Sequence, residues 1–303
     1  MGDIYISAQE LKQLNPQFIP KLAGALSSSD FWYYTRLTTA DQILDSSTFW
    51  VNPISSMNDL DEMDFHYLEK DKIFALCFCN SDSEKIPMWY LYSGIAGKGA
   101  ALGFTPGCML TFLRSLEEVE GEKEDNTRIT LKINRDLHLQ FGWVYYKDQH
   151  NESRIMHKNR WYKIDNIAEF KKDNYNLKNY PWEYEREFRL VFINQTDMDY
   201  KKLIVKIPES MKSRIKLRLA PELSKKELIK SKELKYISSD MGPIPIQSEL
   251  KIKMDLLRRN KNCLPEYLPE YLLEEFTEPK PAIQPETLCE IIKKSSKCPK
   301  STL

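Results

Sequence analysis

The chain has 303 residues, of which 42% are hydrophobic and 29% charged, the balance of a globular protein with enough apolar material for a core. Lys plus Arg and Asp plus Glu each number 44, so the net charge is +0 at pH 7 and no overall basic field marks nucleic acid as an obligate partner. The N-terminal residues lack the pattern of a secretory signal, and no apolar stretch approaches the roughly 20 residues of a membrane-spanning helix. We therefore expect a cytoplasmic protein.

Short strands and helices follow one another irregularly along most of the chain. Runs of β-branched and aromatic residues predict strands at 31–34, 48–51, 73–78, 100–104, 129–133, 139–146, 187–193, 202–207, 214–219 and 250–256. Apolar residues at helical spacing predict helices at 86–92, at 164–174 and at 224–234. Two further helices are predicted, one capped by Thr38 or Thr39 with Ala40, Ile43 and Leu44 inside, and one from Thr105 with Leu110, Leu113 and Leu116 inside. Because regular βαβ alternation is missing, we predict an α+β fold.

Two segments are predicted to lie outside the regular elements. Residues 117–127, EEVEGEKEDNT, are mostly charged and indicate a surface loop. Residues 259–303 contain the repeat LPEYLPEYLL and recurrent prolines, so we expect a weakly docked or disordered extension after a single α+β domain of residues 1–258. Docking of the repeat's Leu and Tyr residues on a partner is the alternative for this extension.

The cysteines and histidines show no metal-binding pattern. Cys77 and Cys79 lie two apart in a predicted strand and are expected to be small core residues on one face. No CxxC or HExxH motif is present, and we expect no metal cofactor. An acidic loop leaves open a metal-dependent nuclease with the carboxylates Asp59, Asp61, Glu62 and Asp64. We rank this last, because the loop has no His ligand and Asn58 and Asp59 are typical of residues that cap their own backbone.

Three glutamates at two-residue spacing, Glu183, Glu185 and Glu187, lead into the predicted strand EFRLVFI. In an extended chain Glu185, Glu187 and Arg189 share one face. Both faces become apolar beyond residue 190, so we predict a central strand that is covered on both sides. Two carboxylates roughly 7 Å apart repel each other and are costly to bury without partners. In a structural interpretation Arg189 pairs with Glu187 and closes the end of the sheet, while Glu183 is solvated.

Six segments, in this order, resemble the bacterial family known as domain of unknown function 2971. The segments are YYTRLTTADQILDSSTFWVNPISSMNDLDE, FALCFCN, MWYLYSGIAGKGAALGF, WVYYKD, WEYEREFRLVF and IKLRLAPELSKKEL. The resemblance runs from about Phe31 to Asp255, which is most of the chain. One departure concerns the opening strand, where the basic residue frequent in the family after the first tyrosine appears here as Tyr33.

The layout of that family is in turn similar to the ADP-ribosyltransferase fold, a split, mostly antiparallel β-sheet with short helices. This resemblance implies NAD as a substrate, held by Tyr34 or Arg36, with Tyr90 or Tyr92 near the nicotinamide. It implies Glu187 as the catalytic carboxylate, with Glu185 two residues before it. It also implies an NAD-dependent transferase or glycohydrolase that modifies a protein or nucleic acid, in toxin or phage-defence settings.

The residue types suit this chemistry. Cleavage of the nicotinamide–ribose bond passes through an oxocarbenium-like state, which a fixed carboxylate stabilises by about 3 kcal/mol. Tyrosine rings offer a flat surface to nicotinamide, and Glu185 would orient or deprotonate an acceptor. The alternative function is a non-catalytic binding or scaffold protein that retains the fold and contacts its partner through residues 259–303.

Overall fold

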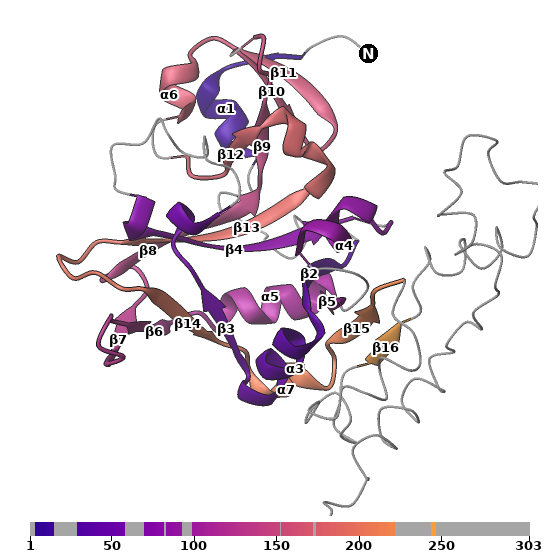
Figure 1. The fold of residues 1–303 in the computed structure, drawn as a ribbon. Coiled ribbons are helices and arrows are strands. Elements are labelled where there is room, and N and C mark those ends of the chain that lie inside the picture. The colour runs from indigo at the N-terminus through magenta and orange to yellow at the C-terminus, as the bar shows by residue number, and fades with distance from the viewer. Residues whose placement is uncertain are drawn as a thin grey trace, which may run out of the picture. The chain divides into compact units, whose positions relative to one another are not determined.

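The computed structural model describes residues 4–14, 29–57, 70–81, 83–92, 99–151, 153–171, 174–221 and 244–246 (Figure 1). These residues combine short helices with mostly antiparallel strand pairs, in agreement with the predicted α+β class. They divide into two compact units that interleave along the sequence. The first unit takes Met1–Tyr33, Ser47–Ser81 and Phe104–Met211, and the second takes Tyr34–Ser46, Asp82–Gly103 and Lys212–Leu303. The expected boundary between residues 258 and 259 lies outside the described residues, as do the strand expected at 250–256 and the helix expected at 224–234.

The first unit contains three groups of paired strands. The central strands pair in the order β2 (Phe31–Arg36, of which Phe31–Tyr33 belong to this unit), β4 (Ile73–Asn80), β13 (Glu187–Asn194) and β8 (Leu137–Trp143). The five-stranded sheet has the order β1 (Ile4–Ile6), β11 (Arg160–Ile164), β10 (Arg154–His157), β9 (Tyr145–Lys147) and β12 (Leu177–Asn179). The four-stranded sheet has the order β3 (Thr48–Val51), β14 (Lys202–Lys206), β6 (Glu118–Glu122) and β7 (Arg128–Lys132).

The helices of the first unit are short. They are α1 (Ala8–Gln13), α5 (Pro106–Arg114) and α6 (Ile167–Lys171), with 3-10 turns η2 (Ile54–Ser56), η3 (Lys70–Lys72) and η4 (Tyr180–Glu185). In α1, Ser7 and Glu10 form a capping box, which satisfies backbone N–H groups that the helix itself leaves unpaired. The Thr105 side chain caps α5 by accepting from the Cys108 N–H, so the predicted start of this helix is confirmed.

The second unit contains α3 (Leu37–Ser46), α4 (Ile86–Tyr92), β5 (Gly99–Phe104), β15 (Lys216–Leu219) and β16 (Ile244–Ile246), and the short helix α7 (Glu209–Lys212) ends at its boundary. Its strands pair in the order β16-β15-β5. Among the described residues no helix is both long enough and apolar enough to cross a membrane.

Strand β13 is buried along its whole length, which confirms the predicted central strand. Phe188, Leu190 and Phe192 lie on one face, where Phe188 contacts the ring of Phe31 at a centroid distance of 4.9 Å. Val191 and Ile193 lie on the opposite face and form a cluster with Ile54, Ile73, Ala75 and Tyr175, against which Met57 and Cys77 pack. Cys77 and Cys79 share this second face, as predicted, because they pair with Arg189 and Glu187 across the β4–β13 ladder.

Four predictions about secondary structure are wrong. The single strand expected at 139–146 is divided at Val144 into β8 and β9, which belong to different sheets. Residues 117–127 do not form a loop, because β6 pairs with β7 in a hairpin that uses the alternation of Glu118, Glu120 and Glu122 with smaller inward residues. Helix α3 begins at Leu37, directly after β2, so Thr38 and Thr39 lie inside it and do not cap it. The helix expected at 164–174 is shorter, because β11 continues to Ile164 and α6 covers only Ile167–Lys171.

Gly121 in β6 sits where no larger residue fits. A Cβ atom at this position would lie 2.5 Å from Tyr200 Cδ1 and 2.8 Å from Leu131 Cδ1. We therefore expect Gly121→Ala to lower the free energy of unfolding by about 1–3 kcal/mol, through overpacking against the buried Tyr200 ring. Denaturant titration would measure the change, with Thr130→Ala on the exposed side of β7 as the control. Equal stability of the Gly121→Ala variant and the wild type would contradict this prediction.

Candidate functional site

The two glutamates expected near the start of the strand, Glu185 and Glu187, lie in different secondary-structure elements. Glu187 is the first residue of β13, whereas Glu185 is the last residue of η4. Arg186 between them has φ 44° and ψ 53°, a left-handed conformation that is uncommon for a residue other than glycine. The Arg186 N–H donates to the Glu183 carbonyl at 3.0 Å, which closes the turn. The expectation that the chain is extended through Glu185 into the strand is therefore wrong, although the carboxylates of Glu185 and Glu187 still converge.

Convergence occurs through two cations. Lys178 Nζ lies 2.6 Å from Glu185 Oε2 and 3.5 Å from Glu187 Oε2. Arg189 donates from Nε to Glu187 Oε1 at 2.7 Å and from Nη2 to Glu187 Oε2 at 2.9 Å, which is a bidentate pair. We call these four residues the carboxylate cluster. It holds two negative and two positive charges, and the predicted pairing of Glu187 with Arg189 is confirmed.

The carboxylate cluster is buried. The exposed fractions are 2% for Glu185, 3% for Glu187, 0% for Arg189 and 7% for Lys178. Burial alone would raise the pKa of Glu187, but Arg189 and Lys178 outweigh burial and hold that pKa well below its usual range. Glu187 is therefore ionised at every physiological pH, and its charge is compensated within the cluster.

Neighbouring residues are shaped to hold this cluster. Arg189 pairs with Cys77 on β4 and with Gly142 on β8, so small residues flank the guanidinium on both sides. The Tyr146 hydroxyl accepts a hydrogen bond of 2.9 Å from the Glu187 N–H. Burial raises the pKa of the Cys77 thiol well above its usual value, and the negative charge of Glu187 adds to this effect, so Cys77 stays a neutral thiol. Lys178 Nζ also lies 4.8 Å from the centre of the Trp182 ring.

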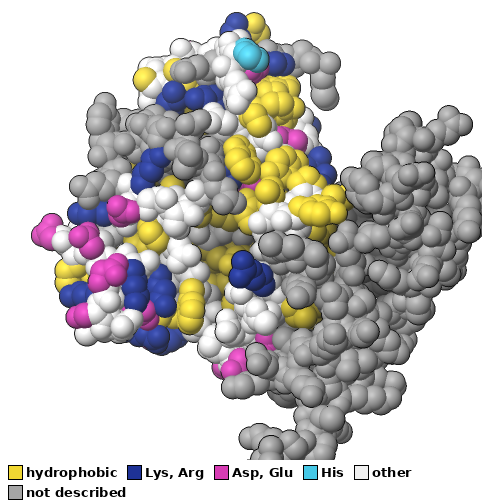
Figure 2. Space-filling model, viewed as in Figure 1, with side chains coloured by type: hydrophobic (Ala, Val, Ile, Leu, Met, Phe, Trp, Pro, Cys, Tyr) yellow, Lys and Arg dark blue, Asp and Glu magenta, His cyan; other side chains and the backbone are white. Residues whose placement is uncertain are grey.

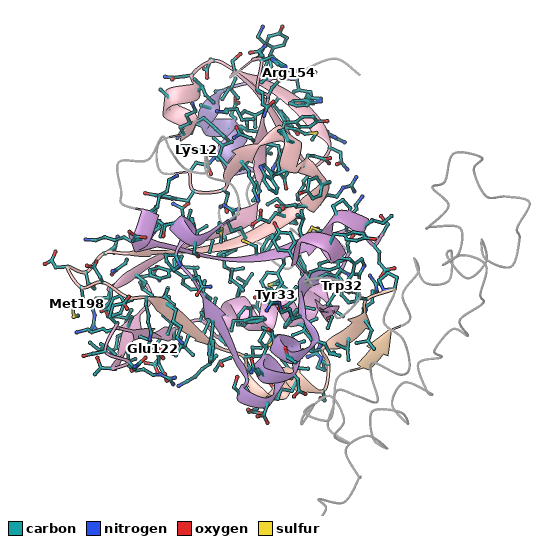
Figure 3. The ribbon with its side chains drawn as sticks, viewed as in Figure 1. Lys12, Trp32, Tyr33, Glu122, Arg154 and Met198 are labelled. Atoms are coloured by element: carbon teal, nitrogen blue, oxygen red, sulfur yellow. The ribbon has the colours of Figure 1, made fainter. Side chains whose placement is uncertain are left out.

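A cross-strand row places an aromatic residue of the first central strand on the same face as Glu187. Trp32 in β2 pairs with Cys79 in β4, and Cys79 pairs with Glu187 in β13. Two strand spacings separate Trp32 from Glu187, which is roughly 10 Å. Trp32 is 4% exposed, and Figure 3 labels it beside Tyr33 on β2. Trp32 is not among the residues predicted from the sequence, because its place opposite Glu187 depends on the register of β2 with β4, which only the structure gives.

The other predicted site residues belong to the second unit. Tyr34 is 6% exposed, and its ring meets the Trp89 ring edge-on at a centroid distance of 4.8 Å. Arg36 is exposed at the end of β2. On α4, Tyr90 is 65% exposed and Tyr92 is partly exposed. Of the predicted residues, the structure thus brings Glu185 and Glu187 together, while Tyr34 packs against the buried Trp89.

A cavity of about 410 Å³ opens elsewhere in the first unit, near the end of β13 that is remote from Glu187. Its lining residues are Lys72, His138, Gln140, Tyr175, Ile193, Asn194, Gln195, Thr196 and Asp197. No member of the carboxylate cluster lines it, so this cavity gives a ligand no route to Glu187.

The structure gives no metal site within its described parts. Among the residues described, no three or more His, Cys, Asp and Glu side chains gather in a way that could hold an ion. The acidic loop with Asp59, Asp61, Glu62 and Asp64 lies outside the described residues.

Comparison with known proteins gives one family. Residues 88–190 match the model of a family described as "Protein of unknown function (DUF2971)". The chain is similar to DUF2971 over this range. The match contains Tyr90, Tyr92 and the whole carboxylate cluster, and it supports the family resemblance seen in the sequence. No curated protein and no solved structure matches the chain.

Proposed function

We propose that this chain is a non-catalytic binding protein in which the carboxylate cluster stabilises the fold. The observation that carries this proposal is the state of Glu187, which is 3% exposed and has both carboxylate oxygens held by Arg189 and Lys178. A carboxylate that stabilises a cationic sugar must face the sugar and carry charge that is not already compensated. Glu187 meets neither condition in this structure.

Opening the cluster would be costly. Moving either cation away leaves a charge in a region from which water is excluded, and breaking a buried ion pair costs about 3–5 kcal/mol. Binding energy from a ligand would have to supply this amount before any chemistry began. A structural role for the cluster needs no such rearrangement, which is why we place it first.

An NAD-dependent transferase or glycohydrolase of ADP-ribosyltransferase-like fold is the second candidate. Two observations support it: Glu187 is permanently ionised at the start of a central strand, and Trp32 lies on the same sheet face. Lys178 is held less closely by Glu187, at 3.5 Å, than by Glu185, at 2.6 Å, so it is the group that NAD would displace. In this function Glu187 would stabilise the sugar cation, and Glu185 would orient the acceptor.

Incubation with NAD labelled in the nicotinamide and in the adenosine part distinguishes the two functions. For a binding protein we expect no release of nicotinamide above the blank and no transfer of label to protein or nucleic acid from a cell extract. Glu183→Gln serves as the matched control for Glu187→Gln, because Glu183 is partly exposed and lies outside the cluster. Release of nicotinamide by the wild type and by Glu183→Gln, but not by a stably folded Glu187→Gln variant, would overturn the proposal in favour of the second candidate.

A further inference from the structure

The five-stranded sheet is basic, although the whole chain is neutral. Its strands have the sequences IYI, YYK, RIMH, RWYKI and LKN. They contain five basic residues, Lys147, Arg154, Arg160, Lys163 and Lys178, and no Asp or Glu. Lys178 is used in the carboxylate cluster. Of the other four cations, Arg154 and Lys163 are cross-strand partners on one face, whereas Lys147 and Arg160 share the face of Tyr145 and Tyr162.

One face of this sheet packs on α1 and α6. Part of the other face is covered by η4, because Tyr146 and Met156 form a buried cluster with Val144 against which Trp161 and Trp182 pack. Tyr145, Ile155, Tyr162 and Ile164 point inward and form a core with Ala8 and Leu11 of α1 and Phe170 of α6. The alternate residues therefore point outward. They form one cross-strand row of Tyr5, Lys163 and Arg154, and a second row of Trp161, Met156 and Tyr146, in which Trp161 is partly exposed and Met156 and Tyr146 are buried. We call Tyr5, Lys163, Arg154 and Trp161, together with Tyr180 of η4, the aromatic–basic face.

Cations and rings touch one another across the aromatic–basic face. Arg154 lies 4.2 Å from the centre of the Trp161 ring, and Lys163 Nζ lies 5.6 Å from that of Tyr5. The rings of Trp161 and Tyr180 have a centroid distance of 5.0 Å. Tyr5 is 76% exposed and Tyr180 is 41% exposed, so rings are offered to solvent beside positive charge. Figure 3 labels Arg154 at the top of the view, where Figure 2 shows Lys and Arg side chains next to hydrophobic ones.

We propose that the aromatic–basic face binds single-stranded nucleic acid. Exposed rings that stack on unpaired bases, set among cations that contact phosphates, are the two features that such binding requires. A duplex hides the faces of its bases, so it would use the cations and not the rings. One acidic side chain does meet the face, since Asp148 Oδ2 pairs with Arg154 Nη1 at 3.2 Å, and it leaves Lys163 on this face for phosphates. This inference names a partner for the binding function proposed above and rests on that function.

The four-stranded sheet supplies a matched control. Trp50 on β3 is 56% exposed and has Lys202 Nζ 4.0 Å from its ring centre, which reproduces the pairing of Trp161 with Arg154. Here, however, Lys202 also pairs with Glu122 at 3.0 Å, and β6 contributes three glutamates. A tryptophan with a cation over its ring is thus present on both sheets, partly exposed for Trp161 and mostly exposed for Trp50, but only the five-stranded sheet lacks acidic residues in its strands.

Fluorescence anisotropy with a labelled oligothymidylate of about 12 nucleotides, a length within the usual site sizes, tests the proposal at about 50 mM salt. We expect saturable binding by the wild type, with Kd increased about tenfold in Trp161→Ala and in Tyr5→Ala. Tyr5→Ala guards against misfolding, because this ring is mostly exposed. Trp50→Ala should bind as the wild type does. Lys163→Ala should reduce the slope of log Kd against log salt by about 0.7, the value for one phosphate contact on a single strand.

Three results would overturn the proposal. The first is no binding at about 100 μM protein, a concentration at the weak limit of non-specific affinity. The second is an equal loss of affinity in Trp161→Ala and Trp50→Ala. The third is tighter binding of the duplex than of the single strand. Binding of an acidic peptide or an anionic vesicle without any binding of the oligonucleotide would also overturn it and would assign the face to that partner. Because nicotinamide release is measured separately, failure of nucleic-acid binding and failure of the non-catalytic function remain distinguishable.

Discussion

Replacing Glu187 with Gln should lower the free energy of unfolding by about 3 kcal/mol, with a fall in melting temperature of roughly 10 °C. The glutamine removes one negative charge from a buried group of two carboxylates and two cations. The charge of Glu185 alone must then balance those of Arg189 and Lys178. An unpaired charge in a region without water is the source of the cost. Thermal and denaturant unfolding at pH 7 would measure the change.

The same variant separates a structural role from a catalytic one. Glu183→Gln should change stability by less than about 0.5 kcal/mol, because Glu183 is partly exposed and its carboxylate is 3.8 Å from Arg186 Nε. Adding Arg189→Met to Glu187→Gln restores the balance of charge, so the double variant should be more stable than the sum of the two single changes predicts. A Glu187→Gln variant with an unchanged melting temperature would contradict the structural role.

Regular alternation made β13 and its ion pair predictable. Side chains two residues apart in a strand lie on the same face, so Glu187 and Arg189 share one face. A carboxylate and a guanidinium that are buried next to each other form an ion pair, because burying either one alone is costly. The same local rules give the bounds of β3 and α4, which match the predicted 48–51 and 86–92. In each case the information lies within a few residues of the chain.

Lys178 was not predictable in this way. It lies in β12 of the five-stranded sheet, and it reaches Glu185 and Glu187 only because the chain turns through η4 and a left-handed Arg186. Arginine gives no signal for that conformation, which glycine and asparagine favour. The pairing of β6 with β7 is different, since Asn126, with φ 65°, is a turn signal that the dense charge of 117–127 obscured.

The aromatic–basic face also escapes a reading of the whole sequence. Net charge sums over 303 residues and gives zero, while the five basic residues of the sheet come from short strands scattered between residues 145 and 179. Strand pairing brings these residues together. It joins segments that are far apart in the sequence, as in the pairing of β1 with β11. Charge matters for binding through its local density, so tertiary structure was needed to find it.

The largest loss of stability should come from Arg189→Met, about 4 kcal/mol at pH 7. Methionine fills much of the volume of the arginine side chain, so lost charge and not a cavity is the main cause. Arg189 is 0% exposed and makes both bidentate bonds to Glu187, and without it Glu185 and Glu187 share only Lys178. Arg135→Met is the control, because Arg135 forms an exposed pair with Asp136 that should contribute little.

The loss caused by Arg189→Met should shrink as the pH falls. In the wild type the pKa of Glu187 is lowered, so its contribution to stability is complete above the unfolded pKa of about 4.3 and is lost as the pH falls toward the folded value. In the variant, burial dominates and raises the pKa of Glu187, so protonation relieves the repulsion from Glu185 and stabilises the folded state. The difference in unfolding free energy between the wild type and Arg189→Met should therefore be smaller at about pH 4 than at pH 7. If their difference instead stays constant or grows toward acid pH, Arg189 does not control the charge of Glu187, and the cluster is not the electrostatic unit that its geometry indicates.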